Sequence, residues 1–287
     1  MLTALAPVVW GSVYLVTTEF LPPGRPLLAG ALRALPIGLL IVAAYRRLPQ
    51  GAWWWRAFVL GQLHIGVFFA LLFVAAYRLP GGIAAIIIAM QPLFVALLGW
   101  MLLAQKPSRV TVAAALSGIG GVALIVIEPG AALDAWGVAA ALGAALCMAA
   151  GTVYASRWPS PVPLLLSTGW QLVAGGLLLI ALALAIEGLP PTLTAHNLGG
   201  FAYLGVVATG LAFWAWFHGL RRIGVSVSFL VLLSPVTAIV LGTLFAGERL
   251  GTVQALGIAV VFASVAAGQW DAVAQSRVRV AALRARP

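Results

Sequence analysis

The sequence has few charged residues. They make up 8% of its 287 residues, whereas soluble domains carry about a quarter. Apolar residues reach 63%, and the mean hydropathy is +1.10. A soluble protein of this length needs a charged surface that this chain cannot supply. The composition therefore excludes an ordinary soluble domain and predicts a membrane protein.

Cysteine, histidine and acidic residues are also scarce. Cys147 is the sole cysteine, so no intrachain disulfide can form. The three histidines, His64, His196 and His218, lack metal-ligand spacing, and neither HExxH nor GxSxG occurs. Each carboxylate lies near the end of an apolar run, so no acid pair lies at depth. We expect no enzymatic activity, no catalytic residue, no metal and no cofactor.

Ten apolar runs are long enough to cross a bilayer, for which about 20 residues are needed. They are 2–19, 26–45, 57–77, 81–104, 110–127, 135–156, 162–186, 197–220, 224–246 and 251–270. Helices are the economical form, because each unpaired backbone group in hydrocarbon costs several kcal/mol. The sequence therefore predicts an all-α integral membrane protein with ten transmembrane helices. Because no basic leader precedes Leu2, the first run is expected to be a retained span.

The 16 basic residues exceed the 6 acidic ones, giving a net charge of +10. In a soluble protein this excess would suggest nucleic acid, but here the basic residues lie in short loops and in the tail 272–287. With the amino terminus cytoplasmic, twelve fall inside and three outside, and Arg33 lies within a span. We predict that both termini are cytoplasmic, that the partner is membrane lipid, and that no nucleic acid binds.

The stretch from Phe73 to Gly121 is largely written again from Trp216 to Ser264. FVAAYRLPGGIAAIIIAMQPLFVALLGWMLLAQKP aligns with WFHGLRRIGVSVSFLVLLSPVTAIVLGTLFAGERL, which places Pro92 on Pro235. Upstream, GSVY at 11–14 returns as GTVY at 151–154. Two repeats follow, 1–130 and 131–271. Each repeat has five spans, an odd number, so the second repeat crosses the membrane in the opposite orientation to the first. Such an inverted repeat predicts alternating access around a site at the middle of the membrane.

These features resemble a known family. The ten spans, the opening Trp10-Gly11-Ser12, the paired prolines and Gly247-Glu248-Arg249-Leu250 followed by Gly257 are similar to the drug/metabolite transporter superfamily, EamA type. Within it, the chain resembles the bacterial exporters of aromatic amino acids. The resemblance implies a metabolite exporter whose central cavity is lined by spans one to four and six to nine. In the first repeat Gln105-Lys106 replaces Glu248-Arg249, so that pair has no counterpart there.

Arg33 is the single charge within a span, about two turns into the second one. Burying it costs about 2.5–3.5 kcal/mol, so water or a partner must compensate. One interpretation is that its side chain reaches the outer interface. The other is that it faces the cavity and pairs with a substrate carboxylate or with a facing carbonyl group. Its repeat counterpart, Gln171, is also polar and within a span.

Polar-tipped aromatic residues and amides recur on the spans that the repeat places centrally. They are predicted to bind substrate, although lipid contact or core packing is the alternative for each aromatic residue. Tyr203, Trp214 and His218 share one helical face of the eighth span. Pro92 and Pro235 are predicted hinges, because proline frees a carbonyl. The predicted substrate-binding residues are Trp10, Tyr14, Arg33, His64, Phe68, Gln91, Tyr154, Trp170, Gln171, Tyr203, Trp214, His218 and Ser234.

The sequence therefore predicts a bacterial inner-membrane exporter of small amphipathic metabolites, including aromatic amino acids. Because no carboxylate lies at depth, facilitation or exchange is favoured over ion coupling. Three alternatives remain: proton-coupled transport of other metabolites or drugs, a channel-like protein, and a carrier of phosphorylated solutes. The last is disfavoured, because only Arg33 could meet a phosphate. A monomer or a weak homodimer is expected.

Overall fold

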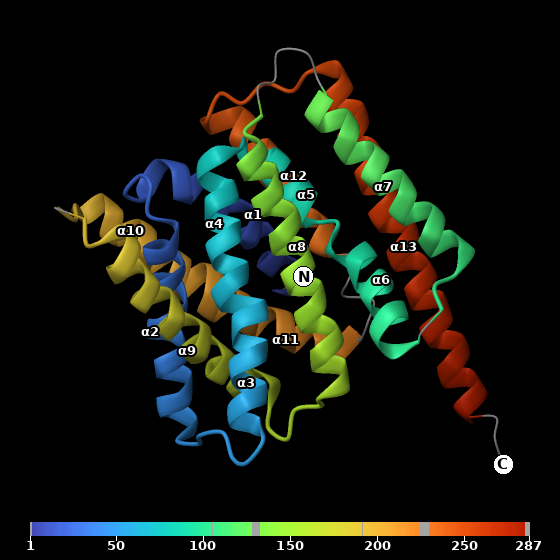
Figure 1. Ribbon diagram of the computed structural model, residues 1–287, viewed down its shortest axis with the longest axis horizontal. Helices are drawn as coiled ribbons and strands as arrows, with labels where there is room; N and C mark the ends of the chain where they lie inside the picture. The colour runs from blue at the N-terminus through green and yellow to red at the C-terminus, as the bar shows by residue number, and fades with distance from the viewer. Residues whose placement is uncertain (1, 105, 128–132, 191, 224–229, 285–287) are drawn as a thin grey trace.

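The computed structural model describes residues 2–104, 106–127, 133–190, 192–223 and 230–284 (Figure 1). Within these residues the regular elements are helices, and no strand is present. The all-helical prediction is therefore confirmed for the described chain. Gln105, Glu128 and Gly224, which entered the repeat and charge arguments, lie outside the described residues.

The two halves of the sequence form two series of helices, in which elements labelled η are π-helical. The first series is α1 (Leu2–Phe20), α2 (Pro26–Tyr45), α3 (Trp53–Gly61), η1 (Gln62–Gly66), α4 (Val67–Arg78), α5 (Gly81–Ile88), α6 (Gln91–Leu103) and α7 (Arg109–Ile127). The second is α8 (Ala135–Arg157), α9 (Leu164–Leu182), η2 (Ala183–Glu187), α10 (Ala195–Ala202), η3 (Tyr203–Leu211), α11 (Ala212–Ile223), α12 (Leu233–Phe245) and α13 (Thr252–Arg284).

Seven helical stretches of the described chain are long and apolar enough to cross a membrane. They are Pro26–Tyr45, Trp53–Arg78, Gly81–Leu103, Ala135–Arg157, Leu164–Glu187, Ala195–Trp216 and Thr252–Gln275. Arg109–Ile125 and Leu230–Phe245 are shorter apolar helices. Each of the ten predicted runs overlaps a helix or a series of helices, the ninth from residue 230 onward. The helix α13 continues to Arg284, through most of the predicted tail.

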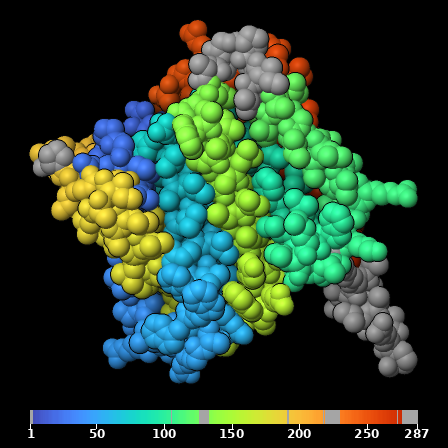
Figure 2. Space-filling model, viewed as in Figure 1, coloured from blue at the N-terminus to red at the C-terminus, as the bar shows by residue number. Residues whose placement is uncertain are grey.

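The helices pack as one bundle with α4 and α8 near its middle (Figure 1). Along one edge α7 lies against α13, and toward the opposite edge α2 lies against α9. Figure 2 shows that side chains fill the space between α4 and α8 on this face. The two largest groups of buried residues join the halves: one contains Tyr14, Ile86 and Val261, and the other Phe69, Leu172 and Leu204.

Helix contacts occur in matched pairs. The helix α1 packs against α12 and α11, and α8, its counterpart in the repeat, packs against α6 and α4. In the repeat α6 corresponds to α12, and α4 to α11. The contact α1–α12 is therefore equivalent to α8–α6, and α1–α11 is equivalent to α8–α4. The pairs α2–α9 and α7–α13 each join a helix to its own counterpart. This is the pattern that a twofold relation between the halves would produce.

Two glycines bring α2 and α9 into backbone contact. A Cβ atom on Gly38 would lie 2.8 Å from the Cβ atom of Leu172 and from the backbone nitrogen of Val173. A Cβ atom on Gly176 would lie 2.9 Å from the Cβ atom of Leu35. Gly38 and Gly176 have the same sequence separation as Arg33 and Gln171, and so do Leu35 and Val173. Small residues at a crossing allow close helix approach in membranes, and here they do so symmetrically.

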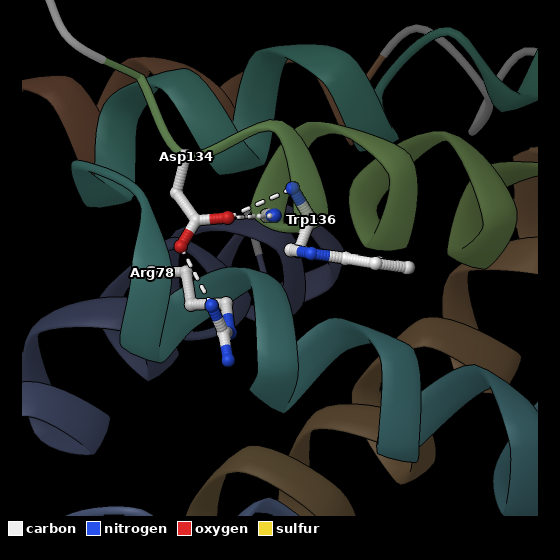
Figure 3. A network of polar contacts seen from close by, with 4 residues as sticks. Arg78, Asp134 and Trp136 are labelled. Carbon is white, nitrogen blue, oxygen red and sulfur yellow. Dashed lines mark hydrogen bonds and ion pairs between the residues drawn. The ribbon is translucent and has the colours of Figure 1, made fainter.

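One end of the bundle, which we call the acidic end, holds Asp134, Glu187 and Glu248. There the Arg78 Nη1 atom donates to the Asp134 Oδ2 atom at 2.6 Å (Figure 3). The Asp134 Oδ1 atom accepts from the backbone nitrogens of Trp136 (2.8 Å) and Gly137 (3.1 Å), which caps α8. The Arg78 hydrogen bond and these amide groups lower the pKa of Asp134.

Two further carboxylates at the acidic end, Glu187 and Glu248, also bind helix N-termini. Glu187 accepts from the backbone nitrogens of Leu27 (2.7 Å) and Leu28 (2.9 Å) in the first turn of α2. Glu248 accepts from the backbone nitrogen of Gly81 at 2.6 Å, in the first turn of α5. Carboxylates are favourable at these positions because the helix dipole and the free amide groups both attract negative charge. Each of these contacts joins a carboxylate of the second half to the start of a helix of the first half.

The opposite end, which we call the basic end, holds Arg46, Arg157 and the loop before α7. Asp271 of α13 lies at this end and accepts from the Ser108 Oγ atom (2.5 Å) and the Thr111 Oγ1 atom (2.7 Å). This contact fastens α13 to the start of α7.

Candidate functional site

A cavity of about 520 Å³ lies between the two halves of the bundle. Its lining residues come from α1, α2, η1, α4, α5 and α6 of the first half, and from α8, α9, α11 and α12 of the second, with loop residues beside α5 and α12. These elements are the eight spans that the family resemblance implied. Among the described residues, α7 and α13 contribute nothing to the lining. The volume lies within the range of about 300–1,000 Å³ that is usual for small-molecule sites.

Most of the residues predicted to bind substrate or to act as hinges meet at this cavity, although they are far apart in the sequence. Those that line it are Trp10, Tyr14, Arg33, His64, Phe68, Gln91, Pro92, Gln171, Ser234 and Pro235.

Arg33 is buried, with 4% of its surface exposed, and it lines the cavity. Its Nε atom donates to the Thr209 Oγ1 atom at 3.0 Å, and its Nη2 atom donates to the Ala208 carbonyl oxygen at 3.3 Å. The guanidinium also lies 4.5 Å from the centre of the Phe69 ring, a cation–π contact. The side chain therefore does not reach the outer interface, which was one of the two interpretations.

Aromatic rings form one wall of the cavity. The Trp10 ring lies 5.8 Å from that of Phe213, edge to face, and 5.3 Å from that of Trp216. The Trp10 Nε1 atom donates to the Ala208 carbonyl oxygen at 3.1 Å, so the indole is fixed in place. Trp10 was predicted from the sequence, whereas Phe213 and Trp216 were not.

Hydrogen-bonding side chains lie between the aromatic rings. The His64 Nδ1 atom and the Gln171 Oε1 atom are 2.7 Å apart, and the Gln171 Nε2 atom donates to the Ser167 Oγ atom at 3.4 Å. In addition, the Gln91 Nε2 atom lies 3.5 Å from the Thr152 Oγ1 atom. The cavity can therefore surround an apolar ring and bind a few polar atoms, an arrangement suited to amphipathic solutes.

Each of the two predicted hinge prolines lies in the first turn of a helix. Pro92 lies in the first turn of α6, after an interruption at Ala89 and Met90 that ends α5. Pro235 lies in the first turn of α12. A proline is tolerated there because its missing N–H would have no intrahelical partner. In both repeats the residue four positions earlier, Ile88 or Val231, also lines the cavity.

Two of the predicted binding residues, both toward the basic end, are not part of the lining. Trp170 is buried, and its Nε1 atom donates to the Arg47 carbonyl oxygen at 2.8 Å. The Tyr154 ring stacks on that of Trp158 with the ring centres 5.2 Å apart. Neither is among the lining residues.

Three predicted residues of the eighth span also lie outside the lining. The Tyr203 hydroxyl lies 2.6 Å from the Ser12 Oγ atom. Trp214 is 48% exposed on the outside of the bundle, and its ring stacks on that of His218. Among the described residues of this span, those that line the cavity are Phe213 and Trp216.

The π-helix η3, which covers residues 203–211, lies between Tyr203 and the pair Trp214 and His218. A π-helical turn holds more residues than an α-helical one, because its hydrogen bonds join residues i and i+5. The face that begins at Tyr203 is therefore rotated before it reaches Trp214, and the 3.6-residue period no longer applies. The sequence did contain the second stripe, Phe213 and Trp216, but gave no basis for choosing between the two.

These observations define a multi-pass helical membrane protein with a cavity between the two halves of its chain. Comparison with known proteins identifies it further. The sequence model of the EamA-like transporter family matches residues 1–127 and again residues 135–267. The chain belongs to this family, and its class is therefore that of a membrane transporter.

Individual relatives cover nearly the whole chain. Protein PecM of Dickeya dadantii (strain 3937) is 43% identical over 263 residues, which are 91% of this chain and 88% of that protein. The uncharacterized inner membrane transporter YedA of Escherichia coli (strain K12) is 28% identical over 268 residues, covering 90% and 86%. A solved structure described as "Crystal structure of protein" aligns with a TM-score of 0.64 and 22% identity over 96% of each chain, which shows the shared fold alone.

Proposed function

We propose that this chain exports small amphipathic metabolites, aromatic amino acids among them, across a bacterial inner membrane by alternating access. The observation that carries this proposal is the cavity. It lies between the two halves of the bundle, receives side chains from both, and combines an aromatic wall with one buried cation.

The proposed architecture is ten transmembrane helices in two inverted five-helix repeats, 1–130 and 131–271. Three observations support it. The family model matches once in each half. Helix contacts occur in matched pairs across the halves. The α2–α9 crossing is symmetric about Gly38 and Gly176. An inverted repeat can exchange the shapes of its halves, which opens the same central site alternately to each side.

The described conformation has the features expected of an inward-facing state. Under the proposed orientation the acidic end faces outward, and there Glu187 and Glu248 join helix ends of opposite halves. The cavity reaches Leu164, the first residue of α9, at the basic end. A solute would therefore enter from the cytoplasm and leave after these contacts separate.

Facilitation or exchange fits the composition of the cavity better than proton coupling. Among the described residues that line it, none is aspartate or glutamate. Intramembrane carboxylates are common components of proton relays.

Counterflow in proteoliposomes tests the proposal. Vesicles loaded with unlabelled tryptophan should transiently accumulate external labelled tryptophan, and the initial rate should saturate. A rate that stays linear with concentration, without counterflow, would instead show a channel. Accumulation that requires an imposed proton gradient would show coupling.

The chain offers a matched pair of variants on one helix. Trp216 lines the cavity, whereas Trp214, two residues earlier, is exposed on the outside of the bundle. We expect Trp216→Leu to reduce the affinity for tryptophan and Trp214→Leu to leave it nearly unchanged. Loss of transport in Trp214→Leu alone would contradict the assignment of this cavity as the binding site.

A further inference from the structure

We infer that the cavity selects aromatic monoanions: its preferred substrate carries a carboxylate that binds Arg33 and lacks the ammonium group of an amino acid. The inference rests on the proposed function, in that it takes this cavity as the transport site. It narrows the substrate class from amphipathic metabolites to aromatic carboxylates.

The guanidinium of Arg33 is only partly satisfied by the protein. Thr209 binds its Nε atom and Ala208 binds its Nη2 atom. Its Nη1 atom is buried and has no hydrogen-bond partner among the described residues. A buried cationic donor without a partner is destabilising. A carboxylate oxygen would supply both the missing acceptor and the missing negative charge.

The charge of the lining favours a ligand with one net negative charge. Arg33 is the single lysine or arginine among the described lining residues, and none of them is acidic. A monoanion would neutralise Arg33. A zwitterion would add an ammonium group that finds only neutral oxygens, such as those of Gln91 and Ser234. Burying a charge without a countercharge is costly, so a zwitterion should bind more weakly.

The aromatic wall lies next to this cation. The Ala208 carbonyl oxygen accepts from both the Arg33 Nη2 atom and the Trp10 Nε1 atom, at 3.3 and 3.1 Å. The Trp10 ring in turn contacts Phe213 and Trp216. In a ligand whose carboxylate binds Arg33 and whose ring packs on this wall, only a short linker would separate the carboxylate from the ring. An aryl group joined to a carboxylate by two or three atoms has this shape.

A matched set of indoles tests the charge preference on the purified full-length protein. Indole-3-propionate is a monoanion, tryptophan a zwitterion, tryptamine a cation, and indole-3-propionamide neutral. We expect indole-3-propionate to bind about tenfold or more tightly than the amide, because hydrogen bonds to charged groups are the stronger class. Tryptophan should be intermediate and tryptamine weakest. Propionate, without a ring, should bind far more weakly than indole-3-propionate.

Arg33→Gln tests whether Arg33 causes the preference for a negatively charged ligand. The informative quantity is the ratio of the affinities for indole-3-propionate and indole-3-propionamide, because a change in the amount of folded protein affects both ligands equally. We expect the ratio to fall to about one in Arg33→Gln and to recover in part in Arg33→Lys, which keeps the charge. Arg109→Gln is the control: Arg109 is exposed at the start of α7, which contributes no lining residue.

The outcomes separate the two proposals. If tryptophan binds as tightly as indole-3-propionate, the monoanion inference is overturned while the transport proposal stands. The same holds if the acid-to-amide ratio is unchanged in Arg33→Gln, since Arg33 would then only position η3. If none of the indoles binds and none is transported, the proposed function itself fails.

Discussion

The close crossing of α2 and α9 allows a sharp test of the packing. Replacing Gly38 by alanine would add a Cβ atom 2.8 Å from the Leu172 Cβ atom and 2.8 Å from the Val173 backbone nitrogen. Ordinary contacts of a Cβ atom lie at 3.4–4 Å. Two of the three nearest atoms belong to the backbone, so no side-chain rotation can relieve the overlap. The helices must move apart by roughly 0.6 Å, the difference between these distances.

The expected loss of stability follows from two opposing effects. Overpacking a well-packed site costs about 1–3 kcal/mol. Replacing glycine by alanine within a helix returns about 1 kcal/mol. We therefore expect Gly38→Ala to lower the free energy of unfolding by up to about 2 kcal/mol. Gly120→Ala on α7 is the control, because a Cβ atom there meets nothing within 4 Å. That variant should be stabilised by about 1 kcal/mol.

Unfolding by a denaturing detergent, followed by tryptophan fluorescence, measures both changes. The opposite signs distinguish a specific clash from a general effect of adding a methyl group. Gly176→Ala should lose stability like Gly38→Ala, because it occupies the equivalent position. If Gly38→Ala proved as stable as Gly120→Ala, the close approach of α2 and α9 would be refuted. A destabilised Gly38→Ala beside a neutral Gly176→Ala would argue against the symmetry.

Three further predictions concern the acidic end and the broken helices. The pKa of Asp134 is lowered in the folded protein. Its ionised carboxylate therefore stabilises the fold above its ordinary pKa of about 4, and this contribution disappears as the pH falls further. In Asp134→Asn, the unfolding temperature should depend less on pH in the acid range. Glu248→Ala should release the start of α5. A cysteine that replaces Ala85, in a background without the native cysteine, should then react faster with an impermeant thiol reagent added outside. An unchanged labelling rate would show that this carboxylate does not hold the outer end closed. Pro92→Ala and Pro235→Ala should each slow counterflow, because alanine, unlike proline, allows the helix to extend toward its N-terminus; wild-type flux in both would show that neither proline acts as a pivot.

Much of the cavity lining could be predicted from the sequence, because the internal repeat pointed to it. The polar residues beside the two prolines, Gln91 and Ser234, occur at equivalent places in the repeat, and both line the cavity. Arg33 was identifiable because a charge within an apolar span needs a compensating environment. These inferences used chemistry that does not depend on the exact rotation of a helix.

Other residues were not predictable, because their positions depend on local helix geometry. The π-helical turns of η3 rotate the eighth span, so Trp216 faces the cavity and Trp214 faces outward. Trp170 was chosen as a polar-tipped aromatic, but it binds a carbonyl oxygen in the loop after α2. The hydrophobic periodicity of the sequence predicts neither the orientation of the eighth span nor the hydrogen bond of Trp170.

The sequence by itself determined that this protein lies in a lipid membrane, that it is helical and that it contains an internal repeat. Composition and run length fix these properties, because a backbone in lipid must satisfy its own hydrogen bonds. The tertiary structure alone decided which side chains meet. The contact of Arg33 with Thr209, and that of Glu248 with the start of α5, join residues of opposite halves. Such contacts depend on how the two halves pack, and that packing follows from the whole surface of each helix rather than from any local pattern.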